Sequence, residues 1–182
     1  FCGTGTLLIE AGLMGRNIAP GLNRTFLAQS WDLIPEQAWI TETENAKDSI
    51  TKTEYRIFGS DHNYKALEVA NKNLELAGLS DIHVQKRDIA EIGSRFDQGK
   101  IITNPPYGER LSEQEDVNKL YKKMGTIFRK QFPDWSYYIL NSNEDFPHFF
   151  GNKATKNRKL YNGGLKCWFF QYYANHKNKK QK

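Results

Sequence analysis

Segments with the pattern of strands alternate with segments with the pattern of helices along most of the chain, and this alternation limits the folds that it can adopt. "EYRIFGSD" predicts a strand that ends at Asp61, and apolar residues recur at helical spacing between residues 63 and 77. "DIHVQKRD" and "KIIT" predict two further strands. Strands that alternate with helices form a parallel sheet with helices packed on it. We therefore expect the α/β class, with a Rossmann-like, doubly wound and mostly parallel sheet.

The second half of the chain continues this pattern and then departs from it. Apolar residues recur at helical spacing from Val117 to Phe132, and "WSYYILNS" predicts a strand. "RKLYNGGLKCWFFQYY" predicts a C-terminal antiparallel hairpin whose turn is Asn162–Gly163. Ile101 and Ile102 predict that the strand "KIIT" is buried.

The sequence opens on a glycine turn. "FCGTGTLLIEAGLM" predicts such a turn followed by a helix through Met14. A doubly wound sheet should have its first, central strand before this turn, and almost nothing precedes it. We therefore expect one N-terminally truncated domain over residues 1–174, with its first strand missing from the sequence, and a basic, disordered tail over residues 175–182.

Polar or glycine residues stand at the end of several predicted strands. They are Gly3–Thr6, Asp61, Asp88 and Asn104–Tyr107. In open α/β sheets, ligands bind beyond the carboxyl ends of the strands. The coincidence therefore predicts a binding site at this edge of the sheet.

The first three of these features fit a nucleoside-bearing cofactor. Gly3 and Gly5 allow a tight turn that leads into a helix N-terminus, but no Gly-Lys-Ser/Thr follows, and Leu8 stands where the dinucleotide pattern needs a third glycine. Asp61 is either an acceptor for ribose hydroxyls or a helix cap, and Asp88 is either an acceptor for an adenine amino group or a loop cap. The pattern predicts an adenosine-bearing cofactor without phosphates.

The motifs "FCGTGT", "GSD", "RDI" and "NPPYGER" together resemble the class I S-adenosylmethionine-dependent methyltransferases that act on amino groups. "NIAPGLNRTFLAQSWD" resembles, more narrowly, a bacterial RNA methylase family whose characterised members methylate N2 of a guanine in 23S ribosomal RNA. The resemblance covers almost the whole chain. It implies a methyltransferase catalytic domain, S-adenosyl-L-methionine as cofactor, and an N-terminal RNA-binding THUMP domain in the parent protein.

The resemblance also implies roles for single residues. The methionine part of the cofactor would be wrapped by Phe1, Cys2, Gly3, Thr4, Gly5 and Thr6. Asp61 would bind the ribose, His62 would lie against the adenosine, and Asp88 with Ile89 would hold the adenine. Asn104 counts among both the cofactor-binding and the catalytic residues. The family's Asp before the opening Phe is not in this sequence, so one cofactor contact has no residue here.

The run Asn104, Pro105, Pro106 and Tyr107 suits methyl transfer to an exocyclic amine. The lone pair of such an amine is delocalised into the base, and two acceptors that hold its hydrogens out of the ring plane would free it. The Asn104 side-chain oxygen and the Pro105 carbonyl can be these acceptors. The prolines bring no competing N–H, and Tyr107 offers a face for a flipped base. The alternative is that the run is only a rigid exit from a strand.

The chain is basic, with a net charge of +5, which favours a nucleic-acid partner. Candidate RNA contacts are Lys156, Arg158, Lys159 and Arg110. Arg110 could instead pair with Glu109.

Other classes of function find less support. The chain has no apolar run long enough for a membrane span and no signal peptide, and Cys2 and Cys167 have no metal-ligand spacing, so we expect a cytoplasmic protein with reduced cysteines and no metal. The segment Pro35–Ile50 predicts an inserted helix whose acidic charge disfavours RNA.

Three alternatives to an RNA guanine-N2 methyltransferase stay open. DNA adenine-N6 methyltransferases and enzymes that methylate a protein glutamine amide use the same Asn-Pro-Pro-Tyr chemistry. A DNA enzyme needs a sizeable recognition segment for which this chain has no room, and the basic hairpin disfavours a protein substrate. In a different class, the chain could be a non-catalytic nucleic-acid-binding module that retains the fold.

Overall fold

The computed structural model describes residues 1–53, 55–108 and 111–174, with side chains described except at 111–113. Glu109, Arg110 and the tail over residues 175–182 lie outside the described residues, so the expectations for them stay predictions. The chain divides into two compact units, one of Cys2–Lys86 and one of Phe1 with Arg87–Lys182. We describe each unit by itself.

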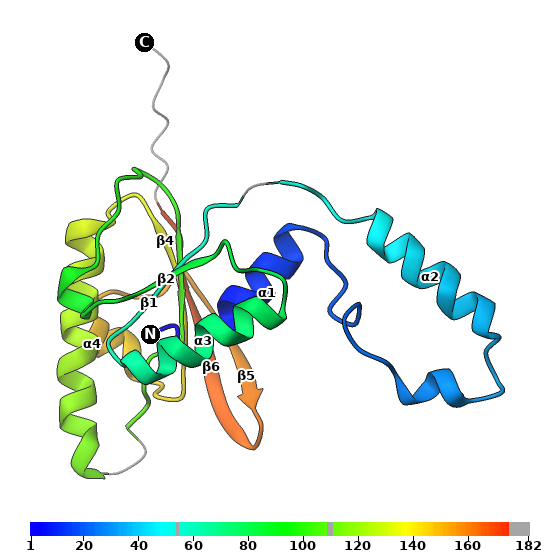
Figure 1. Ribbon diagram of the computed structural model, residues 1–182. Coiled ribbons are helices and arrows are strands. Elements are labelled where there is room, and N and C mark those ends of the chain that lie inside the picture. Colours follow the sequence, from blue (N-terminus) through cyan, green and yellow to red (C-terminus); the bar gives the residue numbers. More distant parts are fainter. Residues whose placement is uncertain (54, 109–110, 175–182) are drawn as a thin grey trace. The chain divides into compact units, whose positions relative to one another are not determined.

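The first unit contains a two-stranded parallel sheet and its helices (Figure 1). Strands β1 (Phe58–Asp61) and β2 (His83–Lys86) pair in parallel, with Phe58 opposite His83 and Asp61 opposite Lys86. The remaining elements are α1 (Thr6–Gly15), η1 (Leu27–Ser30), α2 (Glu36–Asp48) and α3 (Tyr64–Leu76). A helix thus joins two parallel strands, as the alternation predicts.

Helix α3 is well specified by its sequence. The Asn63 side chain caps it, accepting hydrogen bonds from the backbone N–H groups of Lys65 at 3.0 Å and Ala66 at 3.5 Å. Gly78, at φ +71°, follows its end. The helix buries Leu67, Ala70 and Leu74. Leu74 packs with Leu8, Leu79 and Ile82 in the small core of this unit.

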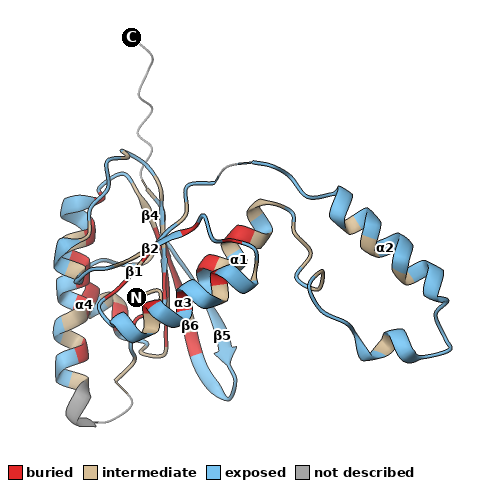
Figure 2. Cartoon of the chain, in the orientation of Figure 1, coloured by how far each residue is buried: buried red, intermediate tan, exposed pale blue. Residues whose placement is uncertain are grey.

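Helix α2 confirms the helix predicted in Pro35–Ile50, since Pro35 directly precedes its first residue. None of its residues is buried, and Figure 2 shows it almost wholly in the colour of exposed residues. Helix α2 therefore adds surface rather than core.

The second unit contains a mixed four-stranded sheet in the order β3-β4-β6-β5. Its elements are η2 (Ile89–Glu91), β3 (Lys100–Thr103), α4 (Leu111–Gln131), β4 (Ser136–Asn141), α5 (Phe146–Phe150), β5 (Lys156–Asn162) and β6 (Leu165–Tyr172). β3 and β4 are parallel, whereas β6 is antiparallel to both β4 and β5. The closing hairpin therefore lies at one edge of the sheet, as expected.

The larger core lies between α4, α5 and this sheet. Helix α4 contributes a stripe of buried residues, visible along one side of the helix in Figure 2: Val117, Tyr121, Met124 and Phe128. The strands contribute Tyr137, Ile139, Phe170 and Tyr172, and α5 contributes Phe146 and Phe150. Aromatic rings thus make up most of this core.

Three expectations need correction. Ile102 is 52% exposed, so β3 is not a buried strand, although Thr103 at its end is buried. Asn162 pairs with Leu165, so the hairpin turn is Gly163–Gly164 rather than Asn162–Gly163. Helix α4 begins at Leu111, six residues before Val117, because apolar spacing marks only the part of a helix that packs on the core.

Within the described residues, no helix combines the length and the apolar character that crossing a membrane requires.

Candidate active site

The glycine turn at the start of the chain is tied to the end of β1. The Cys2 N–H donates to the Ser60 carbonyl at 3.0 Å, and the Gly5 N–H donates to the Cys2 carbonyl at 3.0 Å. Gly5 has φ +90°, and a Cβ there would lie 3.2 Å from Cβ of Ala70. Only glycine suits that conformation and that close approach. The turn thus places the N-terminus of α1 beside the end of β1.

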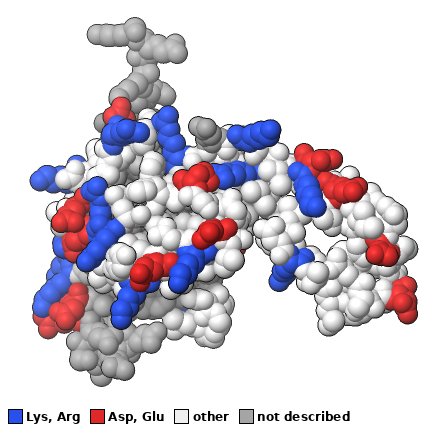
Figure 3. Space-filling model, viewed as in Figure 1, with Lys and Arg blue, Asp and Glu red and all other residues white. Residues whose placement is uncertain are grey.

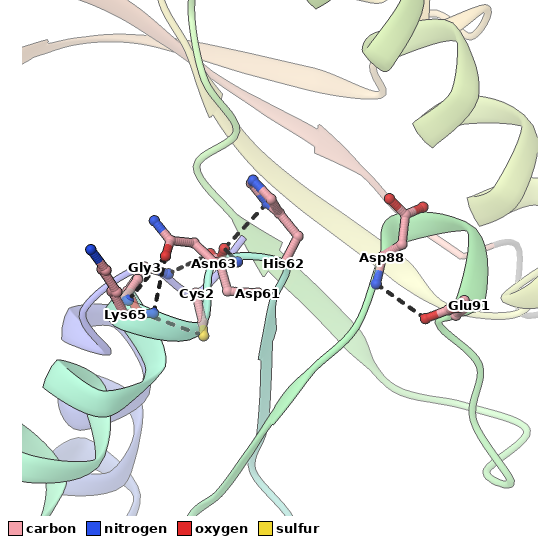
Figure 4. Close-up of polar contacts among 9 residues, drawn as sticks. Cys2, Gly3, Asp61, His62, Asn63, Lys65, Asp88 and Glu91 are labelled. Atoms are coloured by element: carbon pink, nitrogen blue, oxygen red, sulfur yellow. Dashed lines mark hydrogen bonds and ion pairs between the residues drawn. The ribbon is translucent and has the colours of Figure 1, made fainter.

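The Asp61 side chain joins the glycine turn to the start of α3 (Figure 4). It is buried and accepts hydrogen bonds from the Gly3 N–H and the Asn63 N–H, both at 2.9 Å. Nδ1 of His62 lies 3.4 Å from Oδ1. Asn63, not Asp61, caps α3, which corrects the alternative interpretation of Asp61.

Burial would raise the pKa of Asp61, but the hydrogen bonds from Asn63 and Gly3, together with nearby positive charge, outweigh it, so the pKa lies below its usual value. Asp61 is therefore an ionised acceptor at neutral pH. Each carboxylate oxygen can accept more than one hydrogen bond, so hydroxyl groups of a ligand could still be bound.

The other opening residues differ in their surroundings. Thr4 and Thr6 are exposed, and the Thr4 carbonyl accepts a hydrogen bond from Nδ2 of Asn73 at 2.9 Å. Burial raises the pKa of the Cys2 thiol, which keeps it protonated. Phe1 belongs to the other unit, where it packs against the larger core.

Asp88 caps the short helix η2 and lies next to α4. Its Oδ1 accepts from the Ala90 N–H at 2.8 Å and from Nζ of Lys123 at 2.7 Å, while the Asp88 N–H donates to Glu91 at 3.3 Å. Figure 4 shows the last of these contacts. The interpretation of Asp88 as a loop cap is thus confirmed, and a role toward adenine stays a prediction. Ile89 is partly buried against the larger core.

Burial alternates along the loop after β3. Pro105 is fully buried, whereas Asn104 and Pro106 are exposed and Tyr107 is half-buried. The Pro106 carbonyl accepts a hydrogen bond of 2.8 Å from the hydroxyl of Tyr121 on α4. The buried Pro105 ring and the hydrogen bond to the Pro106 carbonyl therefore anchor the loop, while Asn104 stays exposed.

The Tyr107 side chain is tethered through its hydroxyl group. Sγ of Cys167 on β6 donates to it at 3.9 Å, and the side chains of Asn104 and Asn162 also hydrogen-bond with it. Burial, together with Cys167, raises the pKa of Tyr107 to about 12, so the phenol is neutral. The tether fixes the ring next to the β5–β6 hairpin.

Sequence reasoning missed four residues that support this loop. Tyr121 counted only as part of an apolar stripe, and Asn141, which donates to the Tyr121 oxygen at 2.9 Å, was part of a predicted strand without a role. From the sequence, Cys167 was interpreted as a reduced cysteine without a role, and Asn162 as a turn residue. A hydroxyl in an otherwise apolar stripe and an amide at a strand end were the available signals.

The basic residues of the hairpin do not share one face. Every residue of β5 is exposed. Side chains alternate along a strand, so Lys156 and Arg158 point to one face and Lys159 to the other. Lys159 is paired with Trp168, over whose ring Nζ of Lys166 lies at 4.4 Å.

The surface of helix α4 carries both positive and negative charges. On the face shown in Figure 3, basic and acidic side chains are interspersed over the α4 side. Lys119 lies within 2.8 Å of Glu115, and Lys123 within 2.7 Å of Asp88.

Comparison with known proteins places the chain in a family. The model of the RMKL-like methyltransferase domain matches residues 1–171. The chain belongs to this family. It is 41% identical, over 96% of its own length and 46% of the relative, to the RNA methyltransferase candidate YpsC of Bacillus subtilis (strain 168). It is 36% identical, over 98% of its length, to 26% of the ribosomal RNA large subunit methyltransferase K/L of Shewanella baltica (strain OS195). The chain thus spans less than half of either relative.

Solved structures confirm the α/β methyltransferase fold. A possible methylase from Clostridium difficile 630 superposes with a TM-score of 0.92, at 43% identity, over 96% of this chain and 46% of that one. SMU.472, a methyltransferase candidate solved with SAH, gives a TM-score of 0.90 at 38% identity, over 95% and 46% of the two chains. A predicted N6-adenine-specific DNA methylase from Listeria monocytogenes gives 0.88 at 40% identity, over 95% and 45%.

Proposed function

We propose that this domain binds S-adenosyl-L-methionine and transfers its methyl group to an exocyclic amino group of an RNA nucleobase. The observation that carries the proposal is the anchored loop after β3, which exposes the Asn104 amide while Pro105 and the Pro106 carbonyl are held in place. Membership of a methyltransferase family supports the reaction class, and the structural neighbour solved with SAH supports the cofactor.

The loop would act on the amine by geometry alone. The Asn104 side-chain oxygen and the Pro105 carbonyl accept its two hydrogens, so the nitrogen lone pair leaves conjugation with the ring. Tyr107 stacks on the flipped base, and the tether of its hydroxyl keeps the ring in place. The cofactor supplies an electrophilic methyl group: a nitrogen–carbon bond forms, the carbon–sulfur bond breaks, and the nitrogen loses a proton to water.

The cofactor would be held by the opening turn and by residues that follow β1 and β2. Asp61 is a fixed, ionised acceptor beside the turn, and its carboxylate would accept hydrogen bonds from two ribose hydroxyl groups. His62, Asp88 and Ile89 would contact the adenosine. The turn from Phe1 to Thr6 would enclose the methionine part.

For the substrate we propose N2 of a guanine in 23S ribosomal RNA. The name of the K/L relative supports large-subunit RNA, and the sequence resemblance supports guanine N2. On the hairpin, Lys156 and Arg158 share a face on which they could contact two successive phosphates, while Lys159 would contact RNA from the other face.

The test is transfer of labelled methyl groups from S-adenosylmethionine to unmodified ribosomal RNA, to duplex DNA and to a protein extract. We expect label in RNA, and an Asn104→Ala variant should lose about 100-fold or more in kcat because one acceptor of the amine is gone. Asn152→Ala, the same change at an exposed site after α5, should transfer like the unaltered protein. Equal activity of the Asn104 and Asn152 variants would contradict the proposed role of the loop.

DNA adenine-N6 methylation is the second candidate, because a neighbour of 40% identity carries that description. Label in DNA instead of RNA would favour it and keep the chemistry of the loop. Failure to bind the cofactor at all would favour a non-catalytic nucleic-acid-binding module.

A further inference from the structure

We infer that Tyr121 and Asn141 are positioning residues for methyl transfer, because together they fix the Pro106 carbonyl inside the Asn104–Tyr107 loop. The inference rests on the proposed function. It assigns a task in the reaction to two fully buried side chains, which would act through the loop rather than by contact with the substrate.

The two side chains form a directional chain of hydrogen bonds. The Asn143 N–H donates to Oδ1 of Asn141 at 2.8 Å, Nδ2 of Asn141 donates to the Tyr121 oxygen at 2.9 Å, and the Tyr121 hydroxyl donates to the Pro106 carbonyl at 2.8 Å. Each group uses a donor on one side and an acceptor on the other. The chain therefore connects the end of β4, through α4, to the loop.

Packing alone does not need these polar groups. The Tyr121 ring makes an edge contact with Phe146 at a centroid distance of 4.7 Å, and phenylalanine would keep that contact. Burying a hydroxyl and an amide in an aromatic core is favourable only if both are fully hydrogen-bonded. The role of the Tyr121 hydroxyl and the Asn141 amide is therefore to connect α4 and β4 to the loop.

The connection fixes the proposed acceptor from both sides. The Pro105 carbonyl lies in the peptide bond between the buried ring of Pro105 and Pro106, whose own carbonyl is bound by Tyr121. Proline restricts φ but leaves ψ open. The hydrogen bond from Tyr121 limits that remaining freedom at Pro106, and with it the placement of Tyr107.

The first test is Tyr121→Phe, which removes one oxygen. Because a small displacement of reacting groups is costly, kcat should fall about 10- to 100-fold, with KM for RNA and cofactor affinity within about twofold of the unaltered protein. The matched control is Tyr137→Phe. Tyr137 lies in the same core, and its buried hydroxyl donates to the carbonyls of Phe128 at 3.0 Å and Phe132 at 2.6 Å, at the other end of α4. The control should lower the melting temperature but keep kcat.

A second variant tests the direction of the chain. Asn141→Asp replaces the donor by an acceptor, so the Tyr121 hydroxyl should turn from Pro106 to the new carboxylate. We expect the same fall in kcat as for Tyr121→Phe. A normal kcat in both variants, or an equal loss in Tyr137→Phe, would overturn the inference.

A readout without substrate separates this inference from the proposed function. Amide hydrogen exchange at Tyr107 and Gly108, followed by NMR, should speed up in Tyr121→Phe and stay unchanged in Tyr137→Phe. If the unaltered protein methylates no acceptor, the proposed function fails, while the exchange rates still decide whether Tyr121 orders the loop. Unchanged exchange in Tyr121→Phe would overturn the inference even in an active enzyme.

Discussion

Asp61 shows how one carboxylate can order a turn and present acceptor atoms at the same time. Its two oxygens accept from Gly3 and Asn63, which joins the glycine turn to the start of α3. The position of Asp61 after a predicted strand revealed it in the sequence. Tyr121 and Asn141 were not revealed, because their importance depends on a contact across 20 residues of sequence. Sequence pattern finds residues that occupy a strand end, and it misses those that act through a partner.

An Asp61→Asn variant should lose stability and cofactor affinity at neutral pH. The new amide group would turn an N–H toward one of two backbone donors, which we expect to cost about 1–3 kcal/mol in the free energy of unfolding. The pKa of Asp61 is lowered in the folded state, so its contribution is present above the pKa of the unfolded chain and is lost as the pH falls through the folded value.

Urea denaturation at several pH values checks this expectation. The difference in the free energy of unfolding between Asp61→Asn and the unaltered protein should be largest near neutral pH. It should disappear as the pH falls below the ordinary aspartate pKa of 3.8. Asp145→Asn, at an exposed carboxylate without a side-chain cap bond, is the control. A gap that does not change with pH would mean that the charge of Asp61 has no part in its role.

At the scale of elements, the predicted helices and strands exist, and the errors fall where local pattern carries no information. The first turns of α4 lack apolar spacing, so the helix looked shorter than it is. Gly163 adopts φ +60°, and with Gly164 it displaces Asn162 from the turn. The short helix α5 was missed because "FPHFF" is too brief for a periodic signal. The aromatic rings of α5 can be recognised as core residues only when the sheet on which they pack is known.

The cap of α3 offers a prediction at this scale. Asn63→Ala should lower the free energy of unfolding by about 1 kcal/mol, since two N–H groups lose their acceptor. Asn71→Ala makes the same substitution at an exposed site inside the helix and should not destabilise the protein, because alanine favours helices. Chemical denaturation monitored by circular dichroism compares them. Equal stability of the two variants would contradict the capping role.

For the whole molecule, alternation of strands and helices was enough to predict the fold class, and the family comparison agrees with it. The rule that ligands bind at the carboxyl ends of strands selected the candidate residues. The base that the proposed reaction would methylate could not be predicted in the same way, because adenine and guanine would each present an amino group to Asn104 and Pro105. In the proposed reaction, that choice would depend on the shape of the base and on nucleic-acid contacts that no strand pattern encodes.

The measurement that tests the central claim most directly is the identity of the methylated product. Unmodified ribosomal RNA is incubated with the protein and S-adenosylmethionine, digested to nucleosides and analysed by mass spectrometry beside the Asn104→Ala reaction. We predict N2-methylguanosine, absent from the variant reaction. A product methylated on a ring carbon or on a ribose hydroxyl, or a product that the variant makes equally well, would contradict the claim that the Asn104–Tyr107 loop presents an amino group for methylation.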